Sequence, residues 1–323
     1  MHPASIQCRS ANWFYVQVHL PRGFHGDTLI LRFILSLVSL YQYQENTFLL
    51  MACSARYIII FKSELKRVDR WQLGSIERGS EVQHGLTWHE GLIISMGFIG
   101  LNKIYMFTER EFLQYSIIQG RVLDSRILPR GSDESSQTTS HPYDEPQRGI
   151  GTIHEGLVYH IYLNQNDQWT LYKSTLEKLA LTMSYNLTVL FPDVQRFVHI
   201  CANSRTLNFL VQLEDSSYAL AFRSLNACTP IEGMPPVHLP QAVNPRTVCS
   251  TLIDCLKRDV YFINDPLAET LHILDNHHYL LGYSVAAYAI CAVEEKQELM
   301  VLTTQSICSM DLRGNDGFFS QFS

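Results

Sequence analysis

The chain has 323 residues, of which 46% are hydrophobic, 11% aromatic and 17% charged, and its formal net charge is −6. This composition is typical of a globular protein with a buried core, and the many aromatic residues favour strands over helices. The negative charge gives no electrostatic basis for binding nucleic acid, so we expect no nucleic-acid partner. The eight cysteines show no CxxC pair and no His–Cys ligand spacing, which argues against a zinc module and indicates a reducing, cytoplasmic compartment.

The first apolar stretches of the chain predict strands. Residues Asn12–Leu20 read N-W-F-Y-V-Q-V-H-L, a strand-like run near the N-terminus. The next run, Leu29–Leu40, is shorter than the about 20 apolar residues that a spanning helix needs, and Arg32 interrupts it. We therefore expect no membrane partner, and we interpret Leu29–Leu40 as the innermost strand of a first β unit.

A unit of three or four strands then recurs along the chain. Its clearest sign is a pair of T-x-H-E-G-L motifs, Thr87–Leu92 and Thr152–Leu157, each of which leads into an apolar strand. Strand-built repeats at about 40–65 residues predict a β-propeller. We expect residues 1–323 to form one such all-β domain with six blades, and seven blades are the alternative. The copies begin near Ile34, Gln83, Ile150, Arg196, Thr247 and Ala286.

Each copy contributes a hairpin and then a third strand, because β-branched and aromatic residues alternate there with polar ones. The sixth copy lacks a good outer strand, so we expect Asn12–Leu20 to complete the last blade and close the ring. The predicted inner hairpins are Ser36–Leu40 with Phe48–Ala52, Phe197–Cys201 with Leu207–Val211, Val248–Ile253 with Val260–Ile263, and Ala287–Ala292 with Leu299–Leu302. The predicted third strands are Tyr57–Phe61, Lys103–Phe107, Gln168–Tyr172, Tyr218–Phe222, Thr270–Ile273 and Ser306–Met310.

One gap between the copies is longer than the others. It contains Pro129–Arg148, a segment rich in Ser, Asp, Glu, Thr and Pro, between the second and third predicted blades. Such a composition buries little apolar surface. We therefore expect residues 129–148 to be a flexible insertion loop.

Two predicted strands resemble those of known six-bladed propellers. Asn102–Thr108 reads N-K-I-Y-M-F-T and is similar to the N-K-I-Y-W-T strand of YWTD-type propellers. Arg258–Asn264, R-D-V-Y-F-I-N, is similar to it, and both also resemble blades of the NHL type. The resemblance implies a six-bladed propeller with a binding role. Lactonase-like hydrolases share this architecture, which keeps an enzyme with a metal in the central channel as an alternative.

The His-Glu pairs of the repeated motif, His89–Glu90 and His154–Glu155, are the candidate metal-binding or acid–base groups. We place both pairs in turns between first and second strands, on the face opposite the one that propellers commonly use. The glycine suits such a turn, and the glutamate suits an exposed position. We therefore predict no catalytic, metal or cofactor site.

Acidic residues gather in the loops of the face that propellers commonly use. An acidic loop face suits a protein partner with a basic surface. We expect a monomeric, non-catalytic scaffold for protein–protein interaction. The hydrolase alternative requires three or more carboxylate, Asn or His side chains that converge on the channel mouth. The candidate partner-binding residues are Asp167, Glu214, Asp215 and Asp265.

Overall fold

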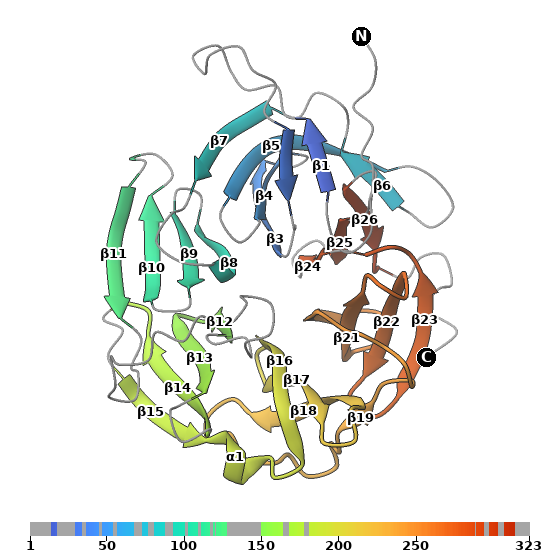
Figure 1. The fold of residues 1–323 in the computed structure, drawn as a ribbon. Helices are drawn as coiled ribbons and strands as arrows, with labels where there is room; N and C mark the ends of the chain where they lie inside the picture. Colours follow the sequence, from blue (N-terminus) through green and yellow to red (C-terminus); the bar gives the residue numbers. More distant parts are fainter. Residues whose placement is uncertain are drawn as a thin grey trace.

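The computed structural model shows a ring of antiparallel sheets (Figure 1). Residues 129–148 lie outside the described residues, between the second and third units of the ring in chain order, and their flexibility stays a prediction. The structure describes residues 14–17, 30–33, 37–44, 47–53, 57–67, 73–76, 81–87, 93–100, 103–108, 111–116, 119, 121–127, 150–163, 168–177, 181–287, 289–293, 297–302 and 307–313.

Four blades have four strands each, and strands that are neighbours in the sequence are neighbours in the sheet. Short polar turns between apolar strands favour this order. The inner strands β8, β12, β16 and β20 contact one another in succession around the ring. The strands of these blades are β8(Ile93–Gly100), β9(Lys103–Thr108), β10(Glu111–Ser116) and β11(Arg121–Ile127); β12(Ile150–His154), β13(Leu157–Leu163), β14(Trp169–Thr175) and β15(Leu181–Asn186); β16(Val194–Ala202), β17(Thr206–Leu213), β18(Tyr218–Ser224) and β19(Val237–His238); and β20(Thr247–Ile253), β21(Arg258–Asp265), β22(Thr270–Asp275) and β23(Tyr279–Ser284). A single described helix, α1(Leu187–Leu190), precedes β16.

The fifth blade is an eight-stranded sheet built from early and late parts of the chain. Its order is β24-β25-β26-β6-β5-β4-β3, and β7 also pairs with β5. Its two inner strands, β3 and β24, contact each other, and they contact β8 and β20 of the neighbouring blades. This contact closes the ring. The strands are β3(Leu37–Gln44), β4(Thr47–Cys53), β5(Tyr57–Arg67), β6(Leu73–Ile76), β7(Glu81–Thr87), β24(Ala289–Val293), β25(Glu298–Leu302) and β26(Ile307–Asp311).

The prediction of six or seven blades is therefore not confirmed, because the described strands of the ring form five sheets. The reason is β6, in which Ser75 pairs with Cys308 of β26 and with Lys66 of β5. This strand joins the first and last predicted units into one sheet. Closure by Asn12–Leu20 is also wrong, because β1(Phe14–Gln17) pairs with β2(Ile30–Phe33) in a separate two-stranded sheet.

The two T-x-H-E-G-L motifs occupy different places in the ring. In the second motif, Glu155 and Gly156 have φ values of 46° and 73° and form the turn from β12 to β13. Two left-handed residues are the usual geometry of a two-residue hairpin turn. In the first motif, Thr87 ends β7, which pairs with β5, so this motif leads from one sheet into β8. The predicted equivalence of the motifs is wrong, and His89–Glu90 lies outside the described residues.

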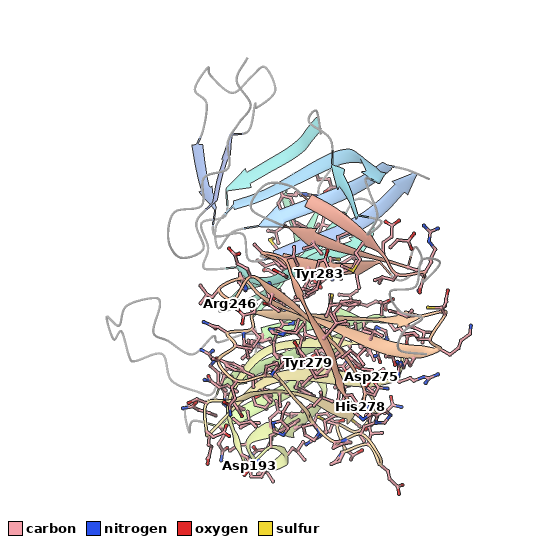
Figure 2. All side chains as sticks on the ribbon, turned by 90° about the vertical axis from the view of Figure 1, so that its right-hand side faces the viewer. Asp193, Arg246, Asp275, His278, Tyr279 and Tyr283 are labelled. Carbon is pink, nitrogen blue, oxygen red and sulfur yellow. The ribbon has the colours of Figure 1, made fainter. Side chains whose placement is uncertain are left out.

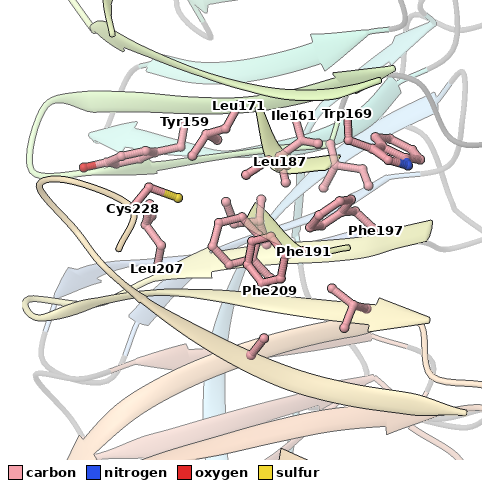
Figure 3. Packing of buried hydrophobic residues seen from close by; sticks show 14 of the residues in the cluster. Tyr159, Ile161, Trp169, Leu171, Leu187, Phe191, Phe197, Leu207, Phe209 and Cys228 are labelled. Atoms are coloured by element: carbon pink, nitrogen blue, oxygen red, sulfur yellow. The ribbon is translucent and has the colours of Figure 1, made fainter. Parts of the chain in front are cut away.

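Apolar side chains fill the wedges between neighbouring blades. Between the β12–β15 and β16–β19 blades, Trp169, Phe191 and Phe209 surround Phe197, with ring centroids 5.4, 5.5 and 5.8 Å from that of Phe197 (Figure 3). These contacts are edge to face, the arrangement that aromatic quadrupoles favour. Because side chains alternate along a strand, each blade can pack against both of its neighbours. The core is therefore a series of layers between blades.

Gly151 allows the β8–β11 and β12–β15 blades to approach closely. An alanine Cβ at this position would lie 2.8 Å from Cε1 and Cζ of Phe107, which is fully buried. We expect Gly151→Ala to lower the free energy of unfolding by about 1–3 kcal/mol, the usual cost of overpacking. Urea denaturation measures this change. The double variant with Phe107→Leu should lose less unfolding free energy than the two single variants lose together. Strict additivity would show that the clash is not the cause.

Candidate binding face

We use the term loop face for one side of the ring, made by the β17–β18 and β21–β22 turns and by the connections that lead into β16 and β20. Asp193 and Arg246 precede those two inner strands. Figure 2 shows them toward one side of the ring, whereas Asp275 and His278 of the β22–β23 turn lie toward the other. The loop face is thus the side on which the sequence predicts partner binding.

Asp265 joins two loops of this face from a buried position at the end of β21, where it is 0% exposed. Its Oδ2 accepts a hydrogen bond from the backbone N–H of Asn244 at 2.6 Å, and its Oδ1 accepts one from Ala268 at 3.0 Å. The first bond reaches the β19–β20 connection, and the second closes the β21–β22 turn. Hydrogen bonds to a carboxylate are stronger than those between neutral groups. One side chain therefore fixes two surface segments.

Asn264 makes a similar link one residue earlier. Its Oδ1 accepts hydrogen bonds from the N–H and the hydroxyl of Thr247, both at 2.7 Å. Its Nδ2 donates to the carbonyl of Ala287 at 3.2 Å, in the connection that leads to β24. We call Asn264 and Asp265 together the Asn–Asp clamp. The clamp holds the β19–β20 connection, the β21–β22 turn and the segment at residue 287 in one arrangement.

Three exposed carboxylates lie on the loop face of the neighbouring β16–β19 blade. We call Asp193, Glu214 and Asp215 the acidic rim. The backbone N–H of Glu214 donates to the carbonyl of Asp193 at 3.1 Å, which brings the two loops together. The hydroxyl and the N–H of Ser217 donate to Oδ1 of Asp215 at 2.6 and 2.9 Å. These bonds lower the pKa of Asp215, so it is ionised at neutral pH.

The structure separates the four residues predicted to bind a partner. Glu214 and Asp215 lie together on one exposed turn, whereas Asp167 lies outside the described residues. Asp265 does not belong to an exposed face, because its carboxylate is buried and bonds to backbone amides. Sequence reasoning missed Asp193 in the connection before β16. It also missed Asn264, although Asn-Asp-Pro at a strand end is a known signal for side chains that bond to nearby backbone.

A buried histidine adjoins the clamp. His272 on β22 is 3% exposed, and its Nδ1 lies 3.0 Å from the hydroxyl oxygen of Tyr279. Its Nε2 lies 3.9 Å from Oδ2 of Asp265 and has no hydrogen-bond partner. Burial lowers the pKa of His272, and the charge of Asp265 opposes that shift. The imidazole is therefore neutral at neutral pH.

The opposite face carries the second His-Glu pair. Nε2 of His154 lies 3.8 Å from Oε1 of the exposed Glu155, and the pair belongs to the β12–β13 turn. No group of three or more His, Cys, Asp or Glu side chains in the described residues could hold a metal ion. The described part of the chain thus gives no support to the hydrolase alternative. Within the same ranges, no helix has the length and apolar character needed to cross a membrane.

Four cysteines of the described residues are free thiols. They are Cys201, Cys228, Cys249 and Cys255. Burial raises the pKa of Cys201 and of Cys228 to about 11. Because the thiolate is the nucleophilic form, these two side chains act at neutral pH as small apolar groups.

A comparison with protein families gives no match, and neither does a comparison with curated proteins. Among solved structures, the chain is similar to the crystal structure of the RRP9 WD40 repeats. The identity is 9%, the TM-score is 0.48, and the alignment covers 86% of this chain and 95% of that chain. The resemblance of two strands to YWTD-type and NHL-type propellers is not confirmed. The propeller fold follows from the ring of sheets itself.

Proposed function

We propose that the chain is a protein-interaction scaffold that binds its partner through the loop face. The Asn–Asp clamp is the observation that carries this proposal, because two buried side chains fix two loop-face segments and the buried Ala287 through five hydrogen bonds. A surface that is ordered before its partner arrives loses less conformational entropy on binding. Loops held by a rigid scaffold are also where binding residues are concentrated.

The acidic rim indicates the chemistry of the partner. Asp193, Glu214 and Asp215 place three exposed carboxylates on two loops joined by a backbone hydrogen bond. Charges of one sign attract and orient a partner of the opposite sign. We propose a protein partner with a basic surface, bound by a cytoplasmic monomer. The free thiols of Cys201, Cys228, Cys249 and Cys255 are in keeping with that compartment.

Neutralising the acidic rim should weaken partner binding. The test variant carries Asp193→Asn, Glu214→Gln and Asp215→Asn, and the matched control carries Glu155→Gln, Glu177→Gln and Asp254→Asn in exposed turns of the opposite face. Both variants remove three negative charges, so net charge is equal. We expect the association rate to fall about tenfold or more at low salt in the rim variant alone, because steering depends on local charge.

The measurement has two stages. Quantitative pull-down from native lysate with the wild-type chain and both variants first identifies proteins that the rim variant alone loses. Surface plasmon resonance with the purified partner then gives association rates at several salt concentrations. Equal binding by the rim variant and the wild type would exclude this face, and equal loss in both variants would indicate a response to net charge.

A further inference from the structure

We infer that protonation of His272 releases Asp265 from the backbone of Asn244, so that acid loosens the connection leading into β20. The inference rests on a continuous line of groups across one blade. Tyr279 on β23 contacts His272 on β22, His272 faces Asp265 at the end of β21, and Asp265 holds Asn244. The line joins the outer strand of the blade to the loop face.

The geometry determines which nitrogen of the neutral His272 imidazole carries the proton. Nε2 of His272 faces a carboxylate, so the neutral ring is favoured with its proton on Nε2, away from Nδ1. The hydroxyl of Tyr279 then donates to Nδ1 over 3.0 Å. Gly282 leaves room for that hydroxyl, since an alanine Cβ there would lie 2.9 Å from it. At 3.9 Å, Nε2 is too far from Oδ2 of Asp265 for a hydrogen bond.

Adding a proton to His272 changes the hydrogen bonding of both imidazole nitrogens. The proton from solvent binds Nδ1, which must then donate, so the Tyr279 hydroxyl turns to accept that bond. The imidazolium also attracts Asp265, and the gap between Nε2 and Oδ2 closes when the carboxylate swings toward the ring. The same Oδ2 accepts from Asn244 at 2.6 Å. One carboxylate oxygen can accept two hydrogen bonds, so the release follows from displacement: as Oδ2 approaches Nε2 it moves away from the Asn244 amide, and the loop loses its anchor.

Among the described residues, two charged or titratable groups contact His272, and the neighbouring blade adds the buried Tyr218 to the same wedge. Asp265 at the end of β21 is the carboxylate, and Tyr279 from β23 is the titratable hydroxyl. The β19–β20 connection contributes the amide of Asn244, and its charged side chain, Arg246, is exposed. Burial lowers the pKa of His272, so the transition is expected on the acid side of the ordinary histidine value of about 6.5.

Release of a bound protein in acid would follow from this change, and that consequence rests on the proposed function. The conformational change itself requires no partner. It is therefore tested on the chain alone, and a failure of partner binding would leave the test intact. The two proposals can fail separately.

Amide hydrogen exchange between about pH 7.5 and pH 4.5, corrected for the intrinsic pH dependence of exchange, tests the inference. In the wild type we expect protection of the Asn244 amide to fall about tenfold, as expected for the loss of one hydrogen bond to a charged group. The buried Phe262 amide reports global unfolding and should stay protected. In His272→Phe, the Asn244 amide should keep its protection. His278→Gln, an exposed change in the same blade, should behave as the wild type does.

A second measurement uses the wild type only, in case His272→Phe does not fold. Nuclear magnetic resonance can follow the His272 ring nitrogens and the Asn244 amide in one titration. We expect the two signals to change with the same midpoint. Different midpoints, or an Asn244 amide that responds to acid in folded His272→Phe, would overturn the inference.

Discussion

Replacing Asp265 with alanine is expected to lower the free energy of unfolding by about 3–6 kcal/mol. The change removes both hydrogen bonds that the carboxylate accepts from backbone amides, and each bond to a charged acceptor contributes about 1.5–3 kcal/mol. The loss of protection from hydrogen exchange should be concentrated on the loop face, because Asn244 and Ala268 belong to its surface segments. Urea denaturation gives the free energy, and hydrogen exchange locates the change.

Asp215→Ala is the matched control for this experiment. Asp215 also lies in a β turn and accepts a backbone hydrogen bond, from Ser217, but its side chain is exposed. Its loss should cost much less than the loss of Asp265, because water replaces the exposed carboxylate. Asp265→Asn should fall between the two, since one amide oxygen replaces two acceptors. Equal losses of unfolding free energy in Asp265→Ala and Asp215→Ala would contradict the anchoring role of Asp265.

Replacing His160 with phenylalanine is expected to stabilise the protein. His160 on β13 is 3% exposed, and neither ring nitrogen has a hydrogen-bond partner. Its ring lies parallel to that of Phe107, with centroids 5.8 Å apart and an interplanar angle of 3°. Phenylalanine keeps this stacking and removes the unsatisfied polar atoms. We expect a gain of about 1–3 kcal/mol at neutral pH.

The gain should increase in acid. Burial lowers the pKa of His160 to about 3, whereas an unfolded histidine binds a proton below about pH 6.5. Between these values the unfolded chain holds a proton that the folded chain does not, so wild-type stability falls as pH falls. At about pH 5 the variant should gain roughly 2 kcal/mol more, at about 1.4 kcal/mol per pH unit.

Urea unfolding of both proteins at the two pH values measures this difference. His199 should keep part of the acid sensitivity in the variant, because burial lowers its pKa to about 4. His278→Phe is the control, because His278 is exposed and lies outside the core. A wild-type pH dependence in His160→Phe would mean that this histidine is protonated in the folded protein.

The strands of this fold could be predicted from the sequence, whereas some of their partners could not. Alternation of apolar residues indicates a strand wherever it occurs, and hairpins such as β20–β21 follow from two strands and a short turn. The pairing of β6 with β26 joins residues more than two hundred positions apart, and a four-residue strand carries no local sign of it. The two T-x-H-E-G-L motifs show the same limit, because similar sequences lead into strands with different partners.

Only part of the candidate site could be predicted, because exposure of a side chain also depends on distant parts of the chain. Carboxylates in turns are visible in the sequence, and Glu214 and Asp215 do lie exposed on the loop face. Whether such a side chain faces solvent depends on what the fold places next to it. Asp265 is buried because the β19–β20 connection brings the amide of Asn244 to it from 21 residues away. That approach is a property of the assembled ring, and the turn sequence alone does not contain it.

The eight-stranded sheet has a consequence for the order in which the molecule can be made. Strands β3 to β7 leave the ribosome before the other four blades, whereas β24, β25 and β26 follow those blades. The edge that β6 offers to β26 must therefore wait while the other four blades emerge, and unpaired strand edges are sites of aggregation. Long-range pairing also slows folding. A nascent chain that stalls before β24 would leave its ring open at both β3 and β6.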